Sequence, residues 1–185
     1  MAAMIDKQPE RRIMKSLASS MCALLACLLI APPLMAVDSD TSRQTLSRIK
    51  GIYVLVEELQ PNIRKPASRL NFTSEQLQKE IESRFQKAGI TVLNRDEWLR
   101  TPGRPVLYLN VNTHQREKYW WAYDIRLEFQ QIASLEANPT IKTLVSTWST
   151  NVTGSVNVGT LAIIGNEVRM LTDIFIKAYL SVNSR

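Results

Sequence analysis

The sequence has little cysteine and little histidine, and this limits the chemistry it can support. The chain of 185 residues holds two cysteines and one histidine. Both cysteines, Cys22 and Cys27, lie near the start, so the rest of the chain can form no disulfide, thiolate metal site or cysteine nucleophile. A single histidine cannot supply the nitrogen ligands of a zinc site. We therefore expect no metal and no cofactor.

The sequence also lacks the motifs of common enzymes and of nucleic-acid-binding proteins. It contains no Gly-x-Ser-x-Gly elbow, and Gly154, Gly159 and Gly165 are too far apart for a loop that cradles a phosphate. The formal net charge is +6, but the charges are scattered and form no basic stripe. We expect no nucleic-acid partner, and enzymatic activity has no support from a motif.

Charge is absent from residues 16–37, which follow a basic start. A basic start, an apolar run and a small residue at Ala36 are typical of a signal peptide, here residues 1–36 with cleavage after Ala36. Two alternatives stay open. The uncharged run is long enough to remain as an uncleaved membrane anchor, and Leu24-Leu25-Ala26-Cys27 resembles a lipobox with Cys27 as the lipid carrier.

The protein is expected in the periplasm or secreted, or else membrane-anchored and facing the periplasm. A membrane contact is expected only through an uncleaved or lipidated N-terminus.

Residues 37–50 are polar and predict a tether, and residues 51–185 predict one α+β domain. Residues 51–59 are rich in β-branched and aromatic side chains and predict a central strand buried on both faces. Residues 60–70 hold two prolines and predict a loop. Thr73 and Gln76 predict a capping box, and the apolar stripe that follows predicts a helix ending at Gly89.

Four further strands and a second long helix complete the prediction. The strands are expected over 90–93, 106–112, 121–131 and 144–150, with a short helical turn at Asp96-Glu97 and a small-residue connection over 154–165. A stripe from Val168 to Val182 predicts the last helix. The order predicts a two-layer sandwich: a mixed sheet of about five strands with two main helices on one face.

The candidate interaction residues are aromatic, except for one histidine. Tyr119 and Trp120 stand at the entry to the strand at 121–131, where Trp120 either closes the end of the core or is an exposed anchor. Tyr53 and Tyr108 lie on strands whose second face could stay open to a partner. His114 follows a strand among polar residues, where a surface role is commoner than catalysis. No catalytic, metal or cofactor-binding residue is predicted.

Several segments resemble a group of small exported bacterial proteins without an assigned function. They are VLVEEL from Val54, the helix from Glu75 to Gly89, LYLNVN from Leu107, Thr147-Trp148-Ser149 and the ending 175–183. The element order is more distantly similar to α/β domains of envelope assemblies, such as the N-terminal domain of TolB and the curli channel subunit. That resemblance implies an assembly role without naming a site.

The leading hypothesis is a non-enzymatic periplasmic protein that binds another envelope component, expected to be a protein, through a sheet edge or an open sheet face. The alternative is a small-molecule or glycan-binding module, with hydrolysis as a further option, built around Trp120. A concave pocket beside Trp120 with polar groups such as Asn110, Asn112 and His114 would favour the alternative. The sequence predicts no oligomeric state.

Overall fold

The computed structural model describes residues 38–70 and 72–183. The expected signal peptide, with its cleavage site and lipobox, lies outside the described residues. The described elements run in the order α2 (Asp40–Gln44), β1 (Tyr53–Val56), α3 (Pro61–Ser68), α4 (Ser74–Lys87), α5 (Arg95–Arg100), β2 (Val106–Glu117), β3 (Trp120–Leu135), β4 (Asn138–Asn157) and α6 (Ala162–Asn183).

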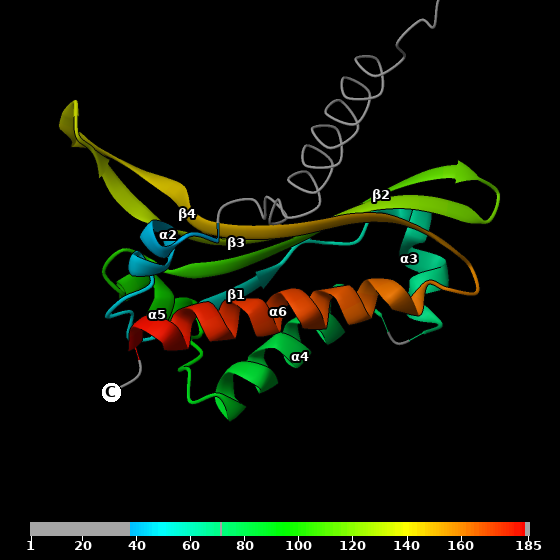
Figure 1. The fold of residues 1–185 in the computed structure, drawn as a ribbon, viewed down its shortest axis with the longest axis horizontal. Helices are drawn as coiled ribbons and strands as arrows, with labels where there is room; N and C mark the ends of the chain where they lie inside the picture. Colours follow the sequence, from blue (N-terminus) through cyan, green and yellow to red (C-terminus); the bar gives the residue numbers. More distant parts are fainter. Residues whose placement is uncertain (1–37, 71, 184–185) are drawn as a thin grey trace, which may run out of the picture. The chain divides into compact units, whose positions relative to one another are not determined.

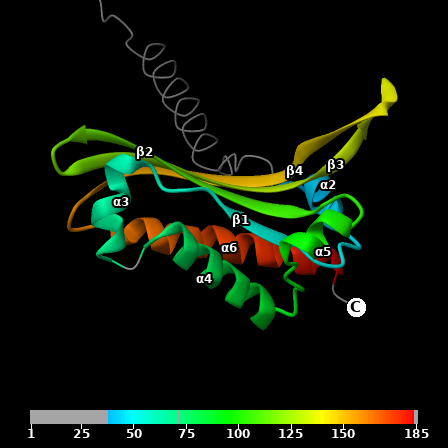
Figure 2. The ribbon, with the colours of Figure 1, turned by 180° about the vertical axis from the view of Figure 1, so that it is seen from behind.

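The strands form one mixed sheet in the order β1-β2-β3-β4. β1 pairs parallel with β2, and the other two pairs are antiparallel hairpins. α4 and α6 lie together on one face of this sheet (Figure 1), and the view from behind shows the same two layers (Figure 2). The α+β class and the two-layer arrangement are therefore as predicted, with four strands in place of about five.

The core lies between the sheet and these two helices. Alternate residues of β3 from Trp121 to Phe129 are buried, as the alternation of the sequence predicts. Three fully buried aromatic side chains, from α4, β3 and β4, surround the fully buried Phe175 of α6. The ring centroid of Phe175 lies 5.5 Å from Phe85, 5.8 Å from Phe129 and 5.1 Å from Trp148. Aromatic contacts at these separations stabilise a core beyond the effect of burial alone.

The sequence signals at the ends of α4 are confirmed. The Thr73 hydroxyl accepts from the Gln76 backbone N–H, and the Gln76 side chain accepts from the Thr73 N–H. Gly89 follows the helix with a φ of +75°, which glycine adopts without steric cost. The short turn predicted at Asp96-Glu97 is α5, where Glu97 completes a second capping box with Asn94.

The expected strand at 90–93 is wrong. It forms only an isolated bridge between Val92 and Ile52, because Asn94 already caps α5. The strand expected at 51–59 is present as β1, but its central position is wrong: β1 is four residues long, lies at the sheet edge and leaves Leu55 41% exposed.

The expected loop at 60–70 contains α3, and the expected connection at 154–165 begins as strand. Pro61 stands at the start of α3, where a missing N–H costs nothing, and Ile63 and Ala67 are buried one turn apart. β4 continues to Asn157 because it stays paired with β3 as far as Trp120.

The expected tether at 37–50 is not a tether over its described part. Ser39 caps α2, and Leu46 is fully buried in the core. Trp148 Nε1 donates a 2.9 Å hydrogen bond to Asp38 Oδ1. The polar composition of this segment hides the apolar anchor, because one leucine among hydroxyl-bearing residues makes no periodic pattern.

Candidate functional site

The face of the sheet opposite α4 and α6, which we call the open face, is mainly polar. The strand register places side chains from three strands in rows across it. These are Tyr108, Asn110, Asn112 and His114 of β2, Ala122, Asp124, Arg126 and Glu128 of β3, and Ser149, Asn151, Thr153 and Ser155 of β4. This part of the face therefore presents mainly hydrogen-bonding groups, while exposed apolar side chains (Leu135, Ile141 and Leu144) lie farther along the β3–β4 hairpin.

Tyr53 and Tyr108 are half-buried and already have partners. Tyr53 stacks on Trp98 of α5 with ring centroids 5.2 Å apart, and the Tyr108 hydroxyl donates to the Glu57 carboxylate. Burial, and then this hydrogen bond, raises the pKa of Tyr108. Leu55, between them, keeps 41% of its surface exposed. These residues form a small polar-rimmed cluster at the β1 end of the sheet.

Tyr119 and Trp120 lie at the other end of the sheet, in the β2–β3 hairpin. Their exposed fractions are 54% and 45%, so Trp120 does not close the core; the buried residue there is its neighbour Trp121. Val158 is also exposed, and its backbone N–H donates to the Tyr119 carbonyl. Lys118 Nζ lies 5.4 Å from the centroid of the Tyr119 ring.

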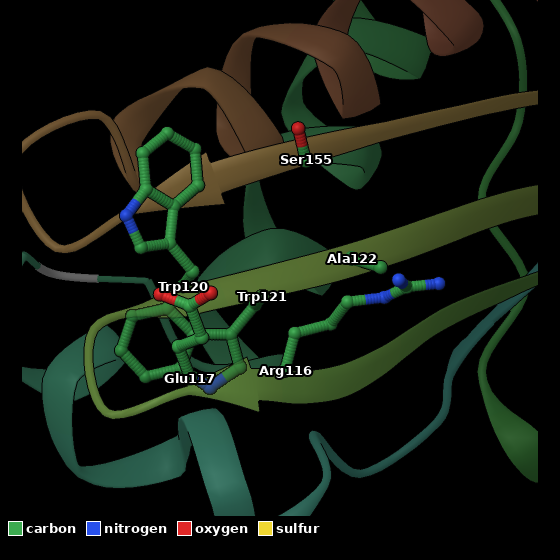
Figure 3. A pocket seen from close by; sticks show the side chains of 6 residues that line it. All are labelled: Arg116, Glu117, Trp120, Trp121, Ala122 and Ser155. Carbon is green, nitrogen blue, oxygen red and sulfur yellow. The ribbon is translucent and has the colours of Figure 1, made fainter.

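Two hollows lie at the hairpin end of the open face. Trp120 lines the first and not the second, the expected Asn112 and His114 line the second, and Asn110 lines neither. The first, of about 440 Å³, is lined by Arg116, Glu117, Trp120, Trp121, Ala122 and Ser155 (Figure 3). The second, of about 380 Å³, is lined by Gln60, Asn112, Thr113, His114, Ala122, Tyr123 and Asp124. Both include Ala122, whose strand partners are His114 on β2 and Ser155 on β4. His114 thus lies inside a strand, and not after one as expected.

The five candidate residues therefore fall into two groups. Tyr53 and Tyr108 belong to the β1 end, and Trp120, Tyr119 and His114 belong to the β2–β3 hairpin end. Along β2, His114 lies six residues from Tyr108, about 20 Å of strand. One small ligand cannot contact both groups.

The outer edge of β4 is a feature that the sequence reasoning missed. β4 is the last strand of the sheet, and among the described residues none hydrogen-bonds to Ser149–Val156 except from β3. The run Thr143–Asn157 contains no charged residue and no proline. This uncharged run is the sequence signal for a long edge strand. The predicted strand at 144–150 covers only part of it, and the predicted connection at 154–165 takes its end.

Within residues 38–70 and 72–183, no group of three or more His, Cys, Asp or Glu side chains could hold a metal ion. No helix in this same part of the chain is long and apolar enough to cross a membrane.

Comparisons with known proteins give no family. No protein-family model matches the chain, and no curated protein matches it. Among solved structures it is similar to a minor lipoprotein from Acinetobacter baumannii, whose crystal structure was determined at 2.35 Å. The match has a TM-score of 0.25 and 10% identity, and it covers 70% of this chain and 84% of that chain. At this TM-score the likeness carries no argument about fold or function.

Proposed function

We propose that this protein is an exported, non-enzymatic component of the bacterial cell envelope that binds another envelope protein by pairing with the outer edge of β4. The single observation that carries the proposal is the edge from Ser149 to Val156, which pairs with no described residue outside β3. At about 3.4 Å per residue these eight residues offer roughly 27 Å of backbone donors and acceptors.

The two edges of the sheet differ in a way that supports this proposal. β1 is only four residues long, and the Ile52–Val92 bridge continues beside it. Natural proteins protect exposed edges with short strands, lysine, proline or covering segments. β1 carries two of these protections. The outer edge of β4 between Ser149 and Val156 carries none of them in the described part of the chain.

The side chains of this edge suit an extended partner. Asn151 and Thr153 are exposed on the open face, and Val152 and Gly154, half-buried, point to the other face. A strand added to an edge gains affinity from backbone hydrogen bonds and specificity from alternate side chains. Short polar and β-branched residues admit such a strand without a steric or charge barrier.

Export rests on the sequence. The uncharged run at 16–37 after a basic start favours a signal peptide, with lipidation at Cys27 and an uncleaved anchor as the alternatives. In all three cases the domain leaves the cytoplasm: it is periplasmic or secreted after cleavage, or tethered to a membrane and facing the periplasm.

The proposal is tested by adding charge to the edge. The double variant Asn151→Lys/Thr153→Lys should abolish capture of the partner from crosslinked envelopes, because each lysine would be placed against the incoming strand. Ser83→Lys/Gln86→Lys adds the same charge at exposed positions of α4 and should leave capture unchanged. Equal capture by wild type and the edge variant would contradict the proposal.

A further inference from the structure

We propose a second, independent function: the hairpin end of the open face binds an uncharged saccharide. The site, which we call the Ala122 trough, consists of the two hollows that share Ala122. The first hollow is bordered by Arg116, Trp120 and Ser155, and the second by Asn112 and Asp124.

The trough exists because Ala122 is small. Along the open face of β3 the neighbours of Ala122 are Trp120 and Asp124, and its cross-strand partners are His114 and Ser155. The larger side chains therefore surround a floor formed by a single methyl group. The hollows, about 440 and 380 Å³, each fall within the usual range of about 300–1,000 Å³ for small-molecule sites.

Trp120 supplies the apolar surface that a sugar ring needs. One face of a pyranose presents C–H groups, which pack against an indole, while the hydroxyls point outward to polar groups. Trp120 is 45% exposed and lies beside Ser155 above the trough (Figure 3). Trp120 belongs to β3, so the sheet fixes its backbone, which lowers the entropy lost on binding.

Some polar groups of the trough provide donors and acceptors that are not yet used, although Asn112 already accepts a hydrogen bond from Gln60. Four side chains of the trough make no hydrogen bond or ion pair with any other described residue: Arg116, Glu117, Asp124 and Ser155. Elsewhere the structure pairs such groups, as in Arg84 with Asp173. A sugar hydroxyl can donate one hydrogen bond and accept others. It can therefore bind the Arg116 guanidinium and a neighbouring carboxylate together, which a simple ion of one charge cannot do.

Charge separates this ligand class from two others. Glu117 and Asp124 more than offset Arg116, so the trough is not built for a phosphate or another strong anion. An anionic membrane surface would meet the same carboxylates. Tyr119 and Trp120 are exposed beside Lys118, a combination also found at lipid interfaces, so the test includes anionic lipid vesicles.

The test observes the indole groups directly. The chain has four tryptophans, so ¹⁵N-tryptophan labelling gives four Nε1–H signals, and Trp120→Phe identifies the one from Trp120. The protein, expressed with its native N-terminal segment and purified from the host envelope, is titrated with soluble oligomers of glucose and of N-acetylglucosamine. The Trp120 signal should shift in a saturable way with at least one series, and the buried Trp148 signal should stay in place.

Variants then locate the binding. Ala122→Leu fills the floor and Trp120→Ala removes the platform, and each should weaken binding at least about tenfold while circular dichroism stays unchanged. Ser83→Leu enlarges a small exposed residue of α4, outside the trough and the β4 edge, and should bind as wild type. The proposal is overturned if no oligomer shifts Trp120, if Ala122→Leu binds normally, or if only anionic lipid vesicles shift the signal. The two proposals share one residue, Ser155, which lines the trough and lies on the β4 edge, so partner capture through β4 is measured separately with the edge variant Asn151→Lys/Thr153→Lys.

Discussion

The indole Nε1 of Trp121 donates a 3.3 Å hydrogen bond to the backbone carbonyl of Asn62. Asn62 lies in α3 four residues before Pro66, which has no N–H to donate to that carbonyl. The core of the β2–β3 hairpin thus supplies the donor that the helix lacks. This explains how a helix can form in a segment whose two prolines predict a loop.

The hydrogen bond predicts coupling between two distant substitutions. Trp121→Phe removes the donor and should lower the free energy of unfolding by about 1–3 kcal/mol, since the Asn62 carbonyl loses its partner. Pro66→Ala restores an N–H within α3. The double variant should therefore lose less stability than the sum of the two single effects, as urea denaturation of all four proteins would measure. Additive losses would show that the two sites are not linked.

Asp38 should stabilise the fold in a pH-dependent manner. The hydrogen bond from Arg43 holds its pKa below the ordinary value of 3.8 against the opposing effect of burial, and Trp148 also donates to it. A lowered folded pKa gives stability that is complete above the unfolded pKa and is lost as the pH falls through the folded pKa. Asp38→Asn should cost about 1–3 kcal/mol at pH near 7 and much less in strong acid.

The matched control for Asp38 is Glu136→Gln, an exposed carboxylate in the β3–β4 turn, which should change stability by less than about 0.5 kcal/mol at any pH. Urea midpoints measured across the acid range distinguish the two variants. A cost for Asp38→Asn that is the same in acid and at neutral pH would contradict the ionic role.

Leu46 should be as important as any core residue, although it lies in the segment that composition predicts as a tether. Its side chain is fully buried, so Leu46→Ala should lower the free energy of unfolding by about 2–5 kcal/mol. Leu70→Ala, at a half-exposed position, should cost less than about 1 kcal/mol. Thermal denaturation compares them, and equal small losses would restore the tether interpretation.

Gly154 allows β4 to approach the Tyr123 ring. A Cβ at this position would lie 2.5 Å from the Tyr123 hydroxyl oxygen and 2.6 Å from Cζ, so Gly154→Ala forces the ring or the strand to move. We expect a loss of about 1–3 kcal/mol. Thr153→Ala, next to it and exposed, should stay within about 0.5 kcal/mol. An unchanged free energy of unfolding for Gly154→Ala would mean that the Tyr123 ring can move aside without cost.

The sequence predicts best those parts of the fold in which several local signals agree. Around α4, a capping box, an apolar stripe and a terminal glycine coincide, and β3 shows five alternating apolar residues. Prediction from the sequence fails where tertiary contacts determine the conformation of a segment. The helical state of α3 depends on Trp121, and the burial of Leu46 depends on the packing of residues 38–50 against the core. Neither leaves a periodic pattern in the chain.

The candidate site was predicted only in part for a similar reason. Aromatic residues mark the hairpin end in the sequence, but the trough arises from Ala122, which is noticeable only once its neighbours are known. The β4 edge depends on strand order. No local pattern shows that β4 is the last strand of the sheet. The absence of charge in Thr143–Asn157 therefore indicates an exposed edge only once the strand order is known.

Site-specific photocrosslinking in living cells tests the central claim, the use of the β4 edge, most directly. A photoreactive phenylalanine derivative is placed at Asn151 or Thr153 on the edge, and at Gln86 on α4 as the control. We predict a discrete crosslinked product with one envelope protein from both edge positions and none from Gln86. Products from Gln86 alone, or none from either edge position in a folded and exported protein, would contradict the account.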